Sequence, residues 1–139
     1  MSQSSLPKLQ HVTITYRPTE KEQLKAFYTK VLGFREKPVP KVVQPLGWVW
    51  FNTADPAVEL HCVSDEALVS ANSRHHFCVE IDDLEDQRER LKKAGCAIVE
   101  AKPLPFRPRF FSRDPFGNLI EFVKVEGDYV SAGEAAELN

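Results

Sequence analysis

The chain has 139 residues, of which 42% are hydrophobic, 27% charged and 10% aromatic, and its formal net charge is −2. This composition is typical of a globular protein and excludes the disordered, collagen-like and coiled-coil classes. With 18 basic and 20 acidic residues, the chain has no excess of cations to neutralise a phosphate backbone, so we expect no nucleic-acid partner.

Hydropathy and cysteine content indicate where the protein works. No apolar run approaches the ~20 residues that a membrane helix needs, and the first ten residues, MSQSSLPKLQ, lack the apolar core of a secretory signal. The three cysteines, Cys62, Cys78 and Cys96, are odd in number and widely spaced, which favours free thiols over disulfides or a cysteine-based zinc site. We therefore expect a cytoplasmic protein without a membrane partner.

The first half of the chain predicts a strand, a helix and further strands, in that order. The helix is expected over residues 18–33, with Thr19 as N-cap, Glu22 completing a capping box and Gly33 ending it. Alternation of apolar and polar residues predicts strands around it, with a weaker indication of one directly after Gly33. These strands are expected at 9–16, 47–51 and 57–63.

The second half repeats the same order. A strand is expected at 75–81, followed by a helix at 82–95 with Asp82 or Asp83 as its cap. Three further strands follow, and the sequence DPFGN at 114–118 predicts a hairpin turn before the last of them. They are expected at 96–100, 108–113 and 118–125.

The two halves predict one βαβββ unit used twice. The interval from Gly33 to Glu59 is 26 residues, and so is the interval from Gly95 to Glu121. We expect an α+β fold in which two βαβββ modules, at about 8–63 and 74–126, form one domain over 1–139 with a flexible tail at 127–139. The curved mixed sheet, a half-barrel, would enclose a cavity.

Four residues at equivalent places in this repeat are candidates for a metal site. One His begins each unit and one Glu lies in its last strand, and in at least three of the four strands alternation puts this side chain opposite the helix-packing face. Two imidazoles and two carboxylates suit Ni, Zn, Co, Mn or Fe as divalent ions, and leave a position open for water or substrate. The predicted ligands are His11, Glu59, His76 and Glu121.

Other residues leave alternatives open. His61 shares a face with Glu59 and could replace or supplement it, and Cys78 follows His76 by two residues. Three arginines around residues 107–113 could bind a carboxylate or phosphate, or could simply solubilise an edge strand. Two tryptophans on one face could line a pocket or pack. The arginines are Arg107, Arg109 and Arg113, and the tryptophans are Trp48 and Trp50.

Five segments resemble the vicinal oxygen chelate superfamily, which includes glyoxalase I, fosfomycin-resistance and bleomycin-resistance proteins, and extradiol dioxygenases. They are LQHVTIT, FYTKVLGF, VELHCV, HHFCVEIDDLEDQRERLKKAG and FFSRDPFGNLIEF, and the resemblance extends from about Lys8 to Val125. It implies paired βαβββ units around a metal, a small-molecule substrate and a homodimer. The family's ligand positions match the four residues chosen above from their spacing.

The ligand pattern is most similar to that of bacterial glyoxalase I. The resemblance implies a lyase or isomerase that transfers a proton between neighbouring carbons, with Glu121 as the catalytic base. Thr15 and Val63 stand where that enzyme has an Arg and an Asn that bind glutathione, so we expect little use of glutathione. Alternatives are a fosfomycin-type thiol transferase, an extradiol-type dioxygenase, or a metal-free drug-binding protein of the bleomycin-resistance kind.

Overall fold

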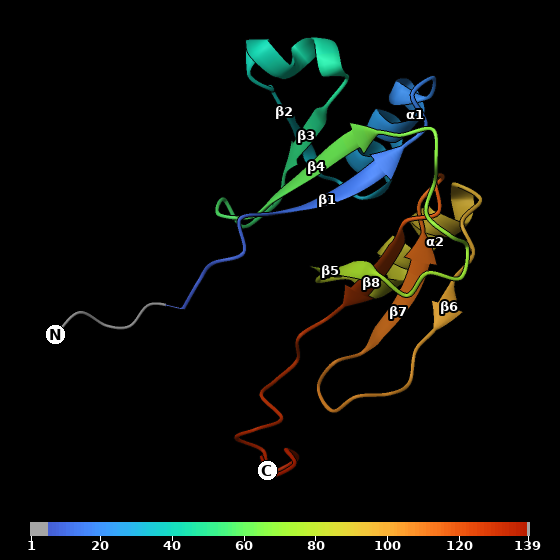
Figure 1. The fold of residues 1–139 in the computed structure, drawn as a ribbon. Coiled ribbons are helices and arrows are strands. Elements are labelled where there is room, and N and C mark those ends of the chain that lie inside the picture. Colours follow the sequence, from blue (N-terminus) through green and yellow to red (C-terminus); the bar gives the residue numbers. More distant parts are fainter. Residues whose placement is uncertain (1–5, 139) are drawn as a thin grey trace, which may run out of the picture. The chain divides into compact units, whose positions relative to one another are not determined.

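The computed structural model describes residues 6–138 and divides the chain into two compact units, Met1–Val69 and Ser70–Asn139 (Figure 1). The boundary lies between the two modules that the sequence predicts, at about 8–63 and 74–126. Among the described residues, no helix has both the length and the apolar character needed to span a bilayer.

The first unit is a four-stranded mixed sheet with a helix, α1 continued by η1, and a separate 3₁₀-helix, η2. In chain order it contains β1 (His11–Tyr16), α1 (Lys21–Ala26), η1 (Phe27–Val31), β2 (Arg35–Lys37), η2 (Lys41–Leu46), β3 (Val49–Asn52) and β4 (Glu59–Ser64). The strand order is β1-β4-β3-β2, with β1 and β4 parallel and the other pairs antiparallel.

The second unit repeats this arrangement. It contains β5 (His76–Glu80), α2 (Leu84–Lys93), β6 (Val99–Glu100), β7 (Arg109–Arg113) and β8 (Leu119–Val123). The order β5-β8-β7-β6, with β5 parallel to β8, is the topology of the first unit. The predicted α+β class and duplicated βαβββ module are therefore confirmed.

One face of each sheet is more buried than the other, because alternate residues of β1, β4 and β8 are apolar and buried. In β4, Leu60 and Cys62 are buried, and in β8, Ile120 and Phe122 are buried. Glu59, which precedes Leu60, and Glu121, which lies between Ile120 and Phe122, therefore project from the other face. This face, which we call the open face of each unit, carries the candidate site.

The first helix begins later than the sequence predicts. The amide of Glu20 donates to the carbonyl of Arg17, so residues 17–20 form a turn, and Glu20 rather than Thr19 is the N-cap. The predicted capping box is therefore wrong. At its other end the helix widens into a π-helical turn over Phe27–Val31 before Gly33, whose φ of +87° ends it.

Candidate metal site and its surroundings

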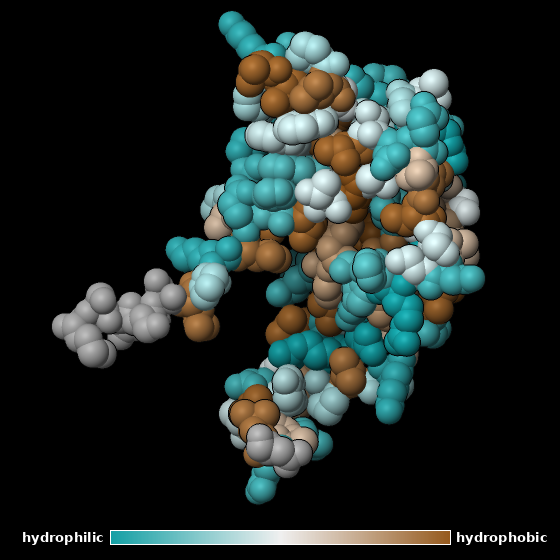
Figure 2. Space-filling view, viewed as in Figure 1, coloured by the Kyte–Doolittle hydropathy of each residue, from teal (hydrophilic) through white to brown (hydrophobic). Residues whose placement is uncertain are grey.

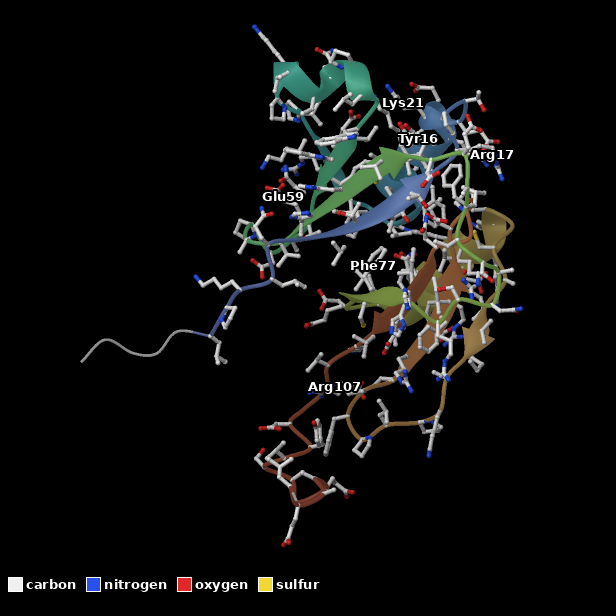
Figure 3. The ribbon with its side chains drawn as sticks, viewed as in Figure 1. Tyr16, Arg17, Lys21, Glu59, Phe77 and Arg107 are labelled. Atoms are coloured by element: carbon white, nitrogen blue, oxygen red, sulfur yellow. The ribbon has the colours of Figure 1, made fainter. Side chains whose placement is uncertain are left out.

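The first unit places its two predicted ligands side by side at one end of the sheet. His11 begins β1 and Glu59 begins β4, and the two residues are direct partners in the parallel ladder. Figure 3 shows Glu59 at this end, where both strands start.

Glu59 is held from two directions. His61 Nε2 lies 2.9 Å from Glu59 Oε1, and the ammonium of Lys37 in β2 forms an ion pair with Oε2. The Lys37 hydrogen bond, followed by that of His61, lowers the pKa of Glu59, although its burial acts in the opposite direction. With 8% of its surface exposed, Glu59 is a fixed carboxylate with both oxygens engaged.

His61 lies in a stack of three rings on the open face. Its imidazole stacks on that of His11, with ring centres 4.0 Å apart, and on the indole of Trp50 at 4.1 Å. His11 Nδ1 lies 2.5 Å from the side-chain oxygen of Gln10. Because that oxygen can only accept, Nδ1 carries the proton and Nε2 keeps its lone pair for a ligand.

The second unit brings His76 and Glu121 into direct contact. His76 Nε2 lies 3.1 Å from Glu121 Oε1, and His76 Nδ1 lies 2.9 Å from the backbone carbonyl of Arg74. Since a carbonyl only accepts, Nδ1 is the donor, and a neutral His76 then directs the lone pair of Nε2 at a carboxylate oxygen. Two electron-rich atoms at this separation need a proton or a metal cation between them.

Glu121 has further partners on the open face. Arg109 Nη1 lies 3.3 Å from Glu121 Oε2, and Arg109 Nη2 donates to the carbonyl of Lys102 at 3.0 Å. Cys78 is the direct partner of Glu121 in the ladder. Desolvation, followed by the charge of Glu121, raises the pKa of Cys78 to about 12. The Cys78 sulfur is therefore a neutral thiol at physiological pH and not a nucleophile.

Each unit has its own carboxylate that contacts an imidazole and a basic side chain, but the strand register around the carboxylate differs between the two units. His11 pairs with Glu59, whereas His76 pairs with Leu119, and Glu121 lies two residues further along β8. By position in the sheet, the counterpart of Glu121 is thus His61. This finding keeps open the alternative that His61 is a ligand.

The arginines and tryptophans have separate roles. Arg113 donates to the carbonyls of Gly117 and Ser73, and Arg107 donates to those of Phe106 and Gly127. These two arginines hold loops, so only Arg109 reaches a candidate ligand. Trp50 packs on His61, and Trp48 has no ring partner among the described residues.

The donor chemistry fits a divalent cation, although residues 6–138 contain no ready-made cluster of three or more His, Cys, Asp or Glu for one. His11 and His76 each hold Nδ1–H on an oxygen, which is the arrangement that orients an imidazole for metal binding through Nε2. The sequence did not indicate Lys37 as a partner of Glu59. The strand after Gly33, which the sequence indicates only weakly, carries Lys37 and places it opposite Trp50 in the ladder.

Comparison with known proteins identifies the family. The sequence profile of the Glyoxalase/Bleomycin resistance protein/Dioxygenase superfamily matches residues 8–122. The chain belongs to this superfamily. It is 35% identical over 112 residues to a lactoylglutathione lyase of Neisseria meningitidis, a match that covers 73% of this chain and 81% of the relative.

Solved structures of superfamily proteins share the fold. A glyoxalase family protein from Bacillus anthracis is 26% identical with a TM-score of 0.76, and the match covers 89% of this chain and 99% of that one. The fosfomycin resistance protein FosX from Listeria monocytogenes is 14% identical with a TM-score of 0.74, covering 94% and 100%. An antibiotic binding protein from Streptomyces, TnmS3, is 21% identical with a TM-score of 0.66, covering 88% and 99%. The last two show the fold alone.

Proposed function

We propose that this superfamily member is a metal-dependent lyase or isomerase that binds two neighbouring oxygens of a small substrate and transfers a proton between adjacent carbons. The observation that carries the proposal is the 3.1 Å contact between His76 Nε2 and Glu121 Oε1, with His76 Nδ1 already committed to the Arg74 carbonyl. This arrangement needs a proton or a metal cation at Nε2, and the family relationship supports a metal ion.

The proposed ligands are His11, Glu59, His76 and Glu121. Imidazole nitrogens and carboxylate oxygens together suit Ni, Zn, Co, Mn or Fe as divalent ions. When bound, such an ion would polarise the substrate oxygens and stabilise negative charge that develops on them. The protein's part is to hold its ligands ionised and oriented, as the hydrogen bonds of Glu59 and His76 do.

Glu121 is the proposed base, which takes a proton from the carbon beside the substrate carbonyl and returns it to the neighbouring carbon. Its contacts, at 3.1 Å to His76 and 3.3 Å to Arg109, are longer than those of Glu59 to His61 and Lys37. A carboxylate that must move during the reaction needs this looser attachment.

The substrate is proposed to differ from a glutathione adduct. Thr15 and Val63, which replace the glutathione-binding Arg and Asn expected from the resemblance, are paired across β1 and β4 and offer no cation. The Neisseria relative is named for a glutathione substrate, so the two proteins would share the proton transfer but not the thiol. We also propose that the protein works as a homodimer in the cytoplasm.

The decisive experiment measures metal content and activity together. We expect His76→Ala to lose most of the metal bound by the full chain while its circular dichroism is unchanged, and Glu121→Gln to lose turnover. His75→Ala is the matched control, because this exposed neighbouring histidine should retain both metal and activity. Methylglyoxal assayed with glutathione and with other thiols tests the predicted preference.

Two outcomes would overturn the proposal. Wild-type protein that binds none of the five metals after reconstitution would favour a metal-free drug-binding protein; the Streptomyces neighbour is named as an antibiotic binding protein. Equal metal content in the His76→Ala and His75→Ala variants would remove His76 from the site.

A further inference from the structure

The first unit contains a pocket whose lining includes Lys37 but none of the four proposed metal ligands. Its volume is about 350 Å³, at the lower end of the range of small-molecule sites (~300–1,000 Å³). Its walls come from α1, β2, η2 and the segment that enters β3. The residues that matter for the argument are Lys21, Lys25, Lys37, Gln44, Trp48 and Val49.

The wall of this pocket is cationic, because three of its residues are lysines and one is acidic. Lys25 pairs with Glu36 at 3.1 Å, and Lys37 pairs with Glu59 outside the pocket. Lys21, labelled in Figure 3, has no carboxylate partner among the described residues and is half-buried. An ammonium in a concave wall without a counter-ion attracts an anion more strongly than one on a convex surface.

The remaining wall is apolar and includes an indole. Trp48 is half-buried and has no stacking partner among the described residues, in contrast to Trp50, which is stacked on His61. Val49 is buried behind it with 3% of its surface exposed. Gln44, at the rim in η2, adds an amide that can donate to an oxygen.

The apolar character of this end of the unit extends to its surface. Figure 2 shows apolar side chains gathered over η2, where Val42 is 83% exposed and Leu46 54% exposed. A ligand entering beside η2 therefore meets apolar surface as well as the lysines, which disfavours a small, fully hydrated ion as its occupant.

We propose that this pocket binds a small molecule that carries a phosphate or carboxylate on a flat apolar body. The anionic group contacts Lys21, and the flat body lies on the indole of Trp48. The site is independent of a metal ion and does not require the proposed catalytic function.

The test uses the full chain, freed of metal with a chelator, in a Trp50→Phe background that leaves Trp48 as the single fluorophore of the two tryptophans. Phenyl phosphate and benzoate are the anionic probes, benzyl alcohol is the neutral probe of the same size, and inorganic phosphate lacks the flat body. We expect at least one of phenyl phosphate and benzoate to quench the Trp48 fluorescence saturably. Benzyl alcohol and inorganic phosphate should bind much more weakly.

Lys21→Met should weaken that binding about tenfold, the effect of losing one charge-assisted contact. Lys30→Met is the matched control, since it removes the same charge from an exposed residue of η1 that does not line the pocket. Circular dichroism confirms that both variants fold. Equal weakening in the two variants, equal binding of benzyl alcohol, or no saturable signal from either anionic probe would overturn the proposal.

Discussion

Asp114 illustrates how much one buried carboxylate contributes to the turn between β7 and β8. Its Oδ1 accepts from the amides of Phe116 and Asn118 at 2.8 and 2.9 Å, and its Oδ2 accepts from the Asn118 side chain at 2.8 Å. Asp114 is 5% exposed and Asn118 6% exposed, so water cannot replace these bonds. The predicted hairpin turn DPFGN is therefore present, and it depends on its first residue.

We expect Asp114→Ala to lower the free energy of unfolding by about 2–4 kcal/mol, because buried donors would lose their acceptor. Urea denaturation of the full chain measures the change. Asp128→Ala is the control, since Asp128 accepts one comparable bond, from the amide of Val130, in an exposed turn. We expect the control to lose less than about 1 kcal/mol, and a similar loss in both variants would contradict this account.

At the site, sequence reasoning found residues whose chemistry shows in their type and spacing, but it missed their partners. The repeat spacing suggested that His76 and Glu121 share a site, although alternation in the strand of Glu121 is weak, and the structure brings the two side chains together. The sequence could not show that Lys37 holds Glu59, because that pairing depends on a three-residue edge strand. Pairing across strands is non-local, so no short sequence window contains it.

At the scale of elements, alternation and helical periodicity predicted the strands of the described residues and both α-helices, whereas the start of α1 was wrong and the 3₁₀-helix η2 was missed. Asp83 caps α2 as expected, accepting from the amide of Asp86 at 3.0 Å. Thr19 does not cap α1, because a turn ending at Glu20 precedes the helix. The motif alone cannot decide between a cap and a turn that use the same residues.

These two positions form a natural pair of variants. Asp83→Ala should lower the free energy of unfolding by about 1 kcal/mol through loss of the cap, and Thr19→Ala by less than about 0.5 kcal/mol, because its exposed side chain caps nothing. Thermal and urea unfolding of both variants measures the difference. A larger loss for Thr19→Ala would restore the capping box that the sequence suggests.

At the scale of the whole molecule, the repeat is one of topology rather than of residue-by-residue positions. The two sheets have the same strand order, but the strand register differs by two residues at the candidate carboxylates. Counting residues onward from Gly33 and from Gly95 aligns Glu59 with Glu121, whereas position in the sheet aligns His61 with Glu121. Spacing along the chain includes loops of different length, and only the ladder reports position across the sheet.

The proposed function predicts that the two halves of the chain share one ion. His11→Ala in the first unit and His76→Ala in the second should each remove most of the metal, which wild-type protein binds at one ion per chain. Saturating metal, at about 100 times its Kd, should stabilise wild-type protein by about 2.7 kcal/mol and raise its Tm by several degrees. Neither variant should gain this stability. Metal analysis and thermal unfolding, with and without added metal, provide the measurement. If each variant instead kept half of the metal and half of the gain in Tm, the units would bind separate ions and the four-ligand site would be wrong.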